Sequence, residues 1–461
     1  MKARQTLKAG AGRADITPAM GIQLAGDIGR HRPTEEIRDH IFANALVLEC
    51  GRERFCLISA DLLAATNEWA DHIRRKAAKL CGTSADRVVF HVVQNHATPT
   101  IGHCFTQNKR SLMPPEYPWL NGGDDRYNEP CVKACLAAVD KAVSNLEPVT
   151  LKVGRGMDGR VAFNRRHVMR DGTARSHIVA CDPELLHVEG PADPEVGVAT
   201  FVNSAGKTIA ALLHHTCHPC HGYPHRYVIG DWPGAWGELM RQREGSQCVP
   251  LVINGCCGNI HHCNHIDPVV NYNTDYHDMA AKLMETTVRV LGQMKPVENP
   301  VFGFASEKVA LPLRKLTAKV IREAQDLLNR HPEPQWGDAS KTSVYWDWVY
   351  AVTILDLKKT QDRSMTQDYE IQALRIGDLA VLTVMGEPFV EVQLAIKLAS
   401  PVKYTFVAHL CNGYAGYVPT RRAFKGGGYE TKTCNGSKWA ESALERIEKA
   451  AVGLLKKACR S

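Results

Sequence analysis

Apolar and polar positions recur along the chain with two different periods, which together predict a protein of mixed α and β structure. Short apolar runs between turn-forming residues predict strands at residues 43–48, 55–59, 88–93, 196–202, 208–213, 250–253, 370–375 and 379–385. Apolar residues at helical spacing predict helices at residues 68–80, 129–146, 233–243, 275–291, 316–329 and 437–457. Residues 332–342 are expected to form a polar loop, and Trp346 and Trp348 lie in a segment without a clear period.

The same pattern predicts the domain organisation. No internal repeat, low-complexity stretch or linker interrupts the 461 residues, and this length is enough to bury a large core. We therefore expect one large α/β domain over residues 1–461, with central β-sheets flanked by helices and a C-terminal helix at about 437–457.

Polar side chains follow four of the predicted strands at the point where each strand ends. They are Gln94, Asn95 and His96 after 88–93, His214 and His215 after 208–213, Asn254 and Cys256 after 250–253, and Glu387 after 379–385. A rigid sheet that delivers such groups into loops is a common way to build a site. The functional site is therefore expected at these strand ends.

Composition and charge exclude several classes of protein. Hydrophobic residues make up 44% and charged residues 23% of the chain, as in an ordinary globular enzyme. The net charge of +7 is small for this length and forms no extended basic patch, which argues against a nucleic-acid partner. No run of 18 apolar residues predicts a transmembrane segment, and residues 1–9 do not resemble a signal peptide. We expect a cytoplasmic protein whose 16 cysteines are reduced and mostly pack in the core.

Histidine and cysteine are concentrated in two stretches, residues 214–225 and 256–265. Neutral imidazole is the commonest metal ligand, and zinc takes nitrogen, sulfur and oxygen donors. Most of these histidines are expected to pack and hydrogen-bond, and at least one to bind a metal. Cys217 and Cys220 form a C-x-x-C pair, for which a redox pair, a structural zinc site with thiols near Cys257, and buried thiols are the alternatives.

Short motifs spread from about residue 10 to 430 resemble those of the neutral/alkaline (non-lysosomal) ceramidases and their bacterial homologues. The segments that carry the resemblance are 12–18 (GRADITP), 24–26 (LAG), 93–99 (VQNHATP), 164–165 (NR), 217–219 (CHP) with 230–234 (GDWPG), 255–259 (GCCGN), 386–389 (GEPF), and 412–420 (NGYAGYVPT) with 428–430 (GYE). Their order and spacing carry the resemblance more than any one of them. It implies a divergent, bacterial-type homologue without the C-terminal immunoglobulin-like domain of the family.

The resemblance also implies an activity and a set of site residues. Members of the family are amidases in which one zinc ion, held by two His, one Glu and one Tyr, activates water. On this chain the resemblance implies one Zn²⁺ with His218, Glu387 and Tyr417 among its ligands. It further implies catalytic roles for Arg165 and Tyr429, which would contact the reacting carbonyl or its oxyanion, and substrate-binding positions at Gly26, Asn164 and Asp231.

Two positions depart from the family pattern. The H-x-H pair that supplies the first zinc ligand of the family is Gln94 and His96 here, so either His96 moves to bind the metal, Gln94 acts as an oxygen donor, or another residue substitutes. The serine of the family's G-D-x-S-P motif is His261 here, an extra imidazole that is either a further ligand or a catalytic base. His96 and His261 are therefore candidate catalytic residues, and His96 is also a candidate ligand.

The sequence leaves the substrate and the oligomeric state open. A small-molecule amide is the expected substrate, and polar residues in 108–127 and 421–429 favour a polar ligand over a long lipid. The same activated water would serve an ester or a lactone, and a carbohydrate-active enzyme could reuse the site. A metal or thiol protein without catalytic activity is the alternative from a different class.

Overall fold

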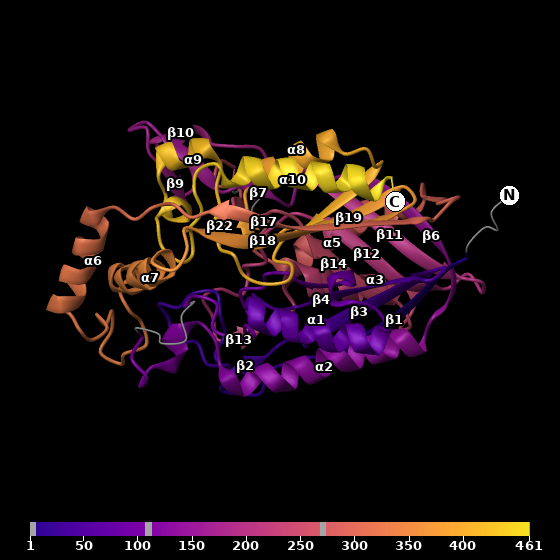
Figure 1. The fold of residues 1–461 in the computed structure, drawn as a ribbon, viewed down its shortest axis with the longest axis horizontal. Helices are drawn as coiled ribbons and strands as arrows, with labels where there is room; N and C mark the ends of the chain where they lie inside the picture. Colours follow the sequence, from indigo (N-terminus) through magenta and orange to yellow (C-terminus); the bar gives the residue numbers. More distant parts are fainter. Residues whose placement is uncertain (1–5, 107–112, 268–272, 461) are drawn as a thin grey trace.

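Two β-sheets packed face to face form the centre of the molecule in this computed structural model, which describes residues 6–106, 113–267 and 273–460 (Figure 1). The larger sheet has the strand order β14-β12-β11-β6-β1-β3-β4-β5, with β16 paired to β6. Its strands are β1 (Leu7–Asp15), β3 (Phe42–Cys50), β4 (Glu53–Ala60), β5 (Val88–Val92), β6 (Glu147–Met157), β11 (Glu195–Asn203), β12 (Thr208–His215), β14 (Val249–Asn254) and β16 (Lys295–Pro296).

The second sheet has the order β17-β18-β19-β21. Its strands are β17 (Phe302–Pro312), β18 (Thr366–Ile376), β19 (Leu379–Thr383) and β21 (Tyr404–Ala408). Short strands pair near the ends of both sheets: β2 (Glu36–Ile37) with β13 (Tyr227–Val228), β7 (Phe163–Asn164) with β15 (Ile260–His261), β20 (Glu387–Pro388) with β22 (Tyr417–Val418), and β8 (Arg166–Met169) with β9 (Ala174–Ser176) and β10 (Leu185–Val188).

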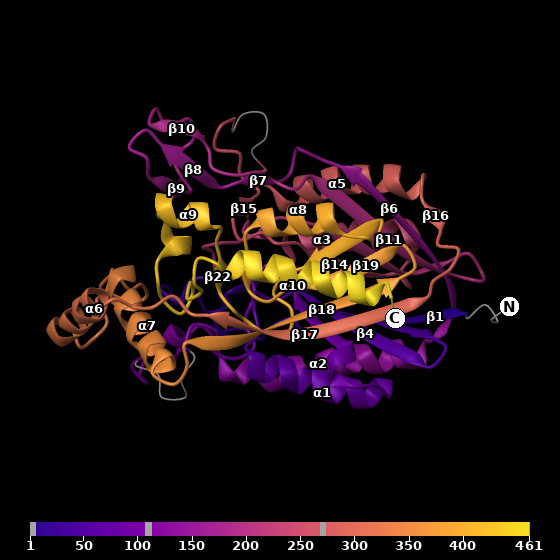
Figure 2. The same cartoon turned by 45° about the horizontal axis from the view of Figure 1, so that its top comes forward.

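Helices cover the outer faces of the two sheets. The larger sheet carries α1 (Asn67–Cys81), α2 (Asp125–Ser144), α3 (Asp231–Glu244) and α5 (Tyr276–Leu291). The second sheet carries α8 (Val390–Ala399) and α10 (Ala443–Ala458), which lie opposite α1 and α2 in Figures 1 and 2. A projection at one end of the sheets contains α6 (Ala318–Arg330) and α7 (Trp346–Gln361), and α9 (Arg421–Gly426) lies near that end.

The alternation of side chains along single strands creates these layers. On β3, Ala43, Ala45 and Val47 face the core under α1 and α2, whereas Leu46 and Leu48 face the second sheet. Successive side chains of a strand point to opposite faces, so a strand that is apolar throughout must be covered on both sides. The core therefore has three layers: one between the sheets and one beneath each set of helices.

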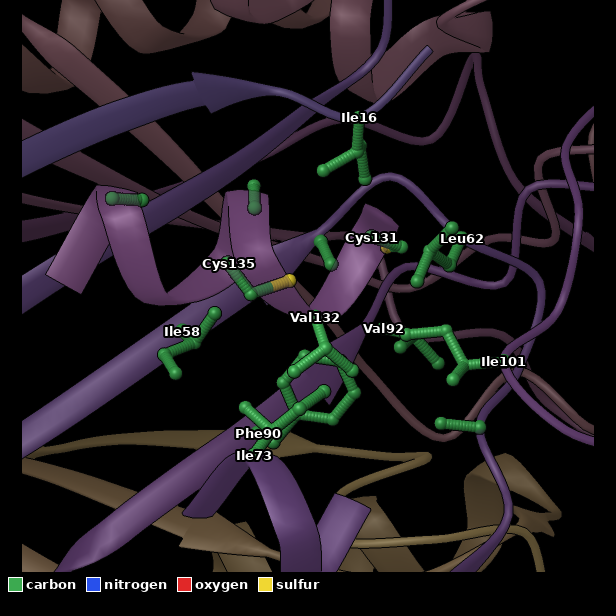
Figure 3. Packing of buried hydrophobic residues seen from close by; sticks show 14 of the residues in the cluster. Ile16, Ile58, Leu62, Ile73, Phe90, Val92, Ile101, Cys131, Val132 and Cys135 are labelled. Atoms are coloured by element: carbon green, nitrogen blue, oxygen red, sulfur yellow. The ribbon is translucent and has the colours of Figure 1, made fainter. Parts of the chain in front are cut away.

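Figure 3 shows the layer beneath α1 and α2. Ile58 and Phe90 come from neighbouring strands of the larger sheet, and they pack with Ile73 of α1 and Val132 of α2. All four side chains are almost completely buried. Burying a side chain of this size is typically worth about 1.5–3 kcal/mol, so this layer holds the helices firmly on the sheet.

The fold confirms the mixed α/β prediction and most of the predicted elements. The segment around Trp346, which had no clear period in the sequence, is the helix α7. Its buried residues, which include Trp348, Val349 and Val352, are not confined to one face, so the sequence shows no helical alternation of apolar and polar positions. The predicted helix 437–457 starts at Ala443, because Cys434 and Ser437 form an isolated bridge in the turn before it. The sequence did not predict β1, β6, β17 and β21.

Two further sequence expectations concern thiols and membranes. No two cysteines form a disulfide in the described residues, in agreement with the expected reduced thiols. None of the helices in the described part of the chain combines the length and apolar character that a bilayer crossing requires.

Close packing of β1 against α2 gives a test of the layered core. A Cβ atom added at Gly12 would lie 2.1 Å from the Ala138 carbonyl oxygen of α2, where only backbone movement could relieve the clash. We expect Gly12→Ala to lower the free energy of unfolding by about 1–3 kcal/mol, measured by urea denaturation. Gly453→Ala is the matched control, because nothing lies within 4 Å of its Cβ position on α10, and it should be neutral or stabilising by about 0.5–1 kcal/mol. Equal effects of the two changes would contradict this packing.

Candidate active site

A cavity of about 820 Å³ opens where the central strands end. One part of its wall is apolar and includes Ile28, Leu63, Phe105 and Trp346. The other part is rich in imidazoles, from His96, His177, His221, His261, His262 and His265. Of the polar stretches 108–127 and 421–429, residues 108–112 lie outside the described structure, and only Tyr429 lines the cavity among the rest. The cavity is therefore amphipathic, and the stretches from which a polar ligand was expected contribute little to its wall.

Asn254, the last residue of β14, ties three strand ends together. Its side-chain nitrogen donates to the carbonyl oxygens of Val93 (2.9 Å) and Cys217 (3.0 Å), and its side-chain oxygen accepts from the Cys217 N–H (3.2 Å). Its own backbone N–H donates to His91 Nε2 at 3.1 Å. Because Asn254 is fully buried, these bonds have no competition from water. The loops that follow β5, β12 and β14 are thereby held in one place.

A second local pairing brings Glu387 and Tyr417 together. These two residues are direct cross-strand neighbours in the short parallel pair β20–β22. The Glu387 N–H donates to the Gly416 carbonyl oxygen at 2.8 Å, and the Tyr414 hydroxyl donates to Glu387 Oε1 at 3.2 Å. The carboxylate is therefore oriented by its own backbone and by one tyrosine.

His218 faces this carboxylate from the loop after β12. Its Nδ1 lies 3.0 Å from the Ile260 carbonyl oxygen, so Nδ1 carries the proton and donates, and Nε2 keeps its lone pair. His218 Nε2 is 3.4 Å from Glu387 Oε2. Both atoms are buried, and neither has a hydrogen-bond partner among the described residues. A pair of facing acceptors with no donor between them is unusual for a buried site and suits a bound cation.

Burial and charge fix the protonation of this pair. Burial lowers the pKa of His218 below its ordinary value, and the cation of Arg165 adds to this effect. Burial alone would raise the pKa of Glu387, but the polar groups around it, among them His218, Gln94 and the Arg165 cation, outweigh this and hold it below its usual range. At neutral pH, Glu387 is a carboxylate and His218 a neutral imidazole, which are the forms that bind metals.

The structure distinguishes between Gln94 and His96. Gln94 adopts a left-handed backbone (φ 70°), and its side-chain oxygen accepts the Cys257 thiol at 3.3 Å. His96 is half-buried in the wall, its ring centroid lies 5.6 Å from that of His218, and its Nε2 has no hydrogen-bond partner in the described chain. His96 is therefore the member of the pair with an unused donor atom.

Arg165 enters the site on a network of buried charges. It directly follows β7, and its N–H donates to the Asn259 carbonyl oxygen next to β15. Its guanidinium donates to the Gly258 carbonyl oxygen (2.7 Å) and to the Tyr417 hydroxyl (3.3 Å), and its Nε lies 3.3 Å from Glu430. Glu430 also pairs with Arg166 at 2.7 Å, and both members of that pair are fully buried. The cation is thus fixed beside Tyr417.

Tyr429 and His261 complete the wall opposite the apolar side. The Tyr429 ring stands edge-on to Tyr417 at 5.8 Å between centroids, and it lies 5.4 Å from the Arg165 guanidinium carbon. His261 Nδ1 accepts the Cys263 backbone N–H at 3.2 Å, so its neutral ring carries the proton on Nε2. Burial, with other imidazoles nearby, lowers the pKa of His261 well below its usual value.

The three predicted substrate-binding residues lie in different places. Gly26 lines the cavity at φ 103°, and a Cβ there would lie 2.6 Å from His96 Nδ1, so this position requires glycine. Asn164 and Asp231 are not among the described residues that line the cavity. Asn164 donates to the Pro191 carbonyl oxygen and accepts from the Arg166 N–H, and Asp231 binds the His221 ring (2.6 Å) from the N-terminus of α3. Both act here as supports for neighbouring residues.

The thiols of the C-x-x-C segment form no compact group of metal donors. Cys217 Sγ donates to the His218 carbonyl oxygen at 3.6 Å, and Cys257 Sγ donates to Gln94. Burial raises the pKa of Cys217, Cys220 and Cys257 well above the usual range, so all three are protonated thiols. A compact group of three possible donors is formed instead by His261, His262 and Cys263 in the described chain.

Three residues of the site were not assigned from the sequence. Tyr414 and Glu430 stand inside the motifs 412–420 and 428–430, so their place in the site could have been suspected from them. His177, whose ring lies 5.0 Å from that of His261, comes from a segment without a motif, and no local signal identifies it.

Comparison with solved structures identifies the fold. The chain superimposes on a crystal structure of neutral ceramidase from Pseudomonas aeruginosa with a TM-score of 0.71 and 18% identity, over 99% of this chain and 75% of that one. A ceramidase complexed with C2 gives the same TM-score at 16% identity, with the same coverage of both chains. The chain matches no protein-family model and no curated protein sequence. It therefore has a neutral ceramidase-like fold, as the sequence motifs predicted.

The role of Asn254 as the anchor of the strand ends can be tested by mutation. Asn254→Ala leaves the Val93 carbonyl and both backbone groups of Cys217 without their partner, at a cost of about 1–3 kcal/mol for each unsatisfied group. We expect it to lower the free energy of unfolding by at least about 3 kcal/mol in urea denaturation. Asn329→Ala, at an exposed position of α6, is the control and should change stability by less than about 0.5 kcal/mol. If Asn254→Ala also changed the free energy of unfolding by less than about 0.5 kcal/mol, the strand ends would have to be held in another way.

Proposed function

We propose that this protein is a zinc-dependent hydrolase that cleaves an amide bond with a metal-activated water. The observation that carries the proposal is the convergence of three buried donor atoms without hydrogen-bond partners: His96 Nε2, His218 Nε2 and Glu387 Oε2. His96 and Glu387 line the amphipathic cavity, and His218 Nε2 lies 3.4 Å from Glu387 Oε2, on a fold that the chain shares with ceramidases.

The residues present fit a zinc ion. His96, His218, Glu387 and Tyr417 offer two nitrogen and two oxygen donors, and zinc would accept both kinds with a further coordination position left for water. Tyrosine is a less common ligand, and burial, with Glu387 adding to it, raises the pKa of Tyr417 well above its ordinary value. The Arg165 cation beside Tyr417 acts in the opposite direction, and a bound metal ion would supply the remaining stabilisation of the phenolate. A bound zinc ion supplies a coordinated water whose pKa is lowered to about 7, and it polarises a substrate carbonyl.

Arg165 and Tyr429 are the groups that can stabilise a developing oxyanion. Glu430 holds the Arg165 guanidinium in place, so the positive charge of Arg165 is already in position before the reaction begins. The Tyr429 hydroxyl adds a neutral donor next to it, and Tyr429 remains 38% exposed, so it can be reached from the cavity. Donors that are already in place when charge develops are usually the largest single contribution to catalysis.

His261 supports amide rather than ester cleavage. An amine is a poor leaving group until its nitrogen receives a proton, and a positioned acid that provides this proton is typically worth about a hundredfold or more. His261 lines the cavity as a neutral ring, so it would first take up the proton that the attacking water loses and then give that proton to the amine. The apolar wall around Leu63 and Phe105 would accept the carbon chain of the substrate, so we propose an amide with an apolar acyl arm.

Metal content separates this proposal from a thiol-bound site. By elemental analysis, we expect the zinc content to fall by about one ion per chain in His218→Ala and in Glu387→Ala. Cys217→Ala is the control: its thiol is equally buried but donates to a backbone carbonyl, so zinc should be retained. Zinc that remains in both site variants and disappears from Cys217→Ala would contradict the proposed ligands.

Activity on a substrate panel tests the reaction class. The panel contains N-acyl amides of increasing chain length with the matching esters and lactones, and we expect the amides to be turned over. Tyr429→Phe should lower kcat by about 100-fold with zinc content unchanged, because it removes one oxyanion donor. Tyr350→Phe, a second tyrosine that lines the cavity, is the control and should keep its kcat. Turnover of esters or lactones alone would favour the esterase alternative, and no turnover with full zinc would exclude hydrolysis of this substrate class.

A further inference from the structure

A second group of donor atoms lies in the same cavity, apart from the proposed zinc ligands. One donor atom from each of His261, His262 and Cys263 lies within 4.8 Å of the other two. All three residues line the cavity and are more than nine-tenths buried. The proposed hydrolysis gives His262 and Cys263 no role.

We propose that His261, His262 and Cys263 form a second metal site, which takes a borderline-soft divalent ion such as Zn²⁺. Two imidazoles and one thiolate are a typical donor set for such ions, whereas Mg²⁺ and Ca²⁺ prefer oxygen donors. Three protein ligands on the wall of a cavity leave at least one coordination position open towards a bound molecule. The proposal does not depend on the hydrolytic function.

The two imidazoles have lone pairs ready for an ion. His262 Nδ1 is buried and has no hydrogen-bond partner among the described residues. His261 Nδ1 is the unprotonated nitrogen of its ring and faces the backbone of Cys263, at a 3.2 Å contact that an ion could replace.

The surrounding residues hold the donors in position. The His221 ring stacks on His262 at 3.7 Å between centroids, and Asp231 and the Asn273 carbonyl oxygen fix both nitrogens of His221. The Asn273 side chain donates to the His262 carbonyl oxygen at 3.2 Å. A support that orients a ligand ring in this way is typical of protein metal sites.

The second site is adjacent to the first but uses different chemistry. The Ile260 carbonyl that orients His218 directly precedes His261 in the chain, so the two sites share one backbone segment. The first donor set, His96, His218, Glu387 and Tyr417, contains no sulfur, whereas the second contains Cys263. A probe for a metal–sulfur bond therefore reports the second site alone.

Titration of the metal-free, full-length protein with Co²⁺ provides this probe. We expect a thiolate-to-cobalt charge-transfer band in the near ultraviolet, which saturates at about one ion per chain. Cys263→Ser should abolish the band, and His262→Ala should weaken the affinity that it reports by at least about tenfold. Visible absorption of the bound cobalt reports both sites, so a variant that merely fails to fold is recognised by the loss of both signals.

Two controls make the outcome specific. Cys434→Ser removes another buried thiol of the same cavity, and Glu387→Gln alters the first site, so both should keep the band. Absence of the band from the unmodified protein, or its persistence in Cys263→Ser, would overturn the second site. Failure of the proposed hydrolase would instead appear as zinc that His218→Ala and Glu387→Ala leave unchanged in a protein that also carries Cys263→Ser, so the two failures are distinguishable.

Discussion

The hydrogen bonds of the Asn254 side chain are the constraint on which the site depends. β5, β12 and β14 belong to one sheet, but β5 lies at the edge opposite β14, so the strand order alone does not bring their ends together. Asn254 joins the ends of these strands through Val93 and Cys217, in a place that water does not reach. Gln94 and His218 come one residue after these two anchors. The second sheet then adds Glu387 through the pairing of β20 with β22.

Desolvation sets the electrostatics of this cavity. Burial lowers the pKa of His96, His218, His261 and His262, so these rings stay neutral. Glu387 keeps its charge because polar groups around it, including the Arg165 cation, outweigh the effect of burial. Arg165 and Arg166 remain cationic inside the protein because Glu430 and Glu189 pair with them. Removing one partner of such a network leaves a buried charge uncompensated, which is far more damaging than the loss of an exposed ion pair. The site therefore combines fixed charges with neutral rings, an arrangement that suits cation binding and oxyanion stabilisation.

Local patterns in the sequence predicted much of the fold and part of the site. Strands such as β12 and β14 are continuous apolar runs because both of their faces are covered, and α1 ends at Gly82 in the left-handed conformation that favours glycine. β1 was missed because glycines at 10 and 12, which α2 needs for close approach, break its apolar run. The motifs identified Glu387, Tyr417 and His218, whose proximity the structure bears out. The motifs did not show that Asn164 and Asp231 lie outside the cavity wall, because the direction of a side chain cannot be read from a motif. His177 reaches the site only through long-range packing, which no local pattern encodes.

The central claim is that donors from separate strand ends hold one zinc ion. Anomalous X-ray scattering at the zinc edge, recorded from crystals of the full chain, tests it most directly. The account predicts a peak at about 2.0–2.2 Å from His96 Nε2, His218 Nε2, a Glu387 oxygen and the Tyr417 oxygen. The absence of a peak among these four residues, or zinc bound by Cys217 and Cys220 in its place, would contradict it.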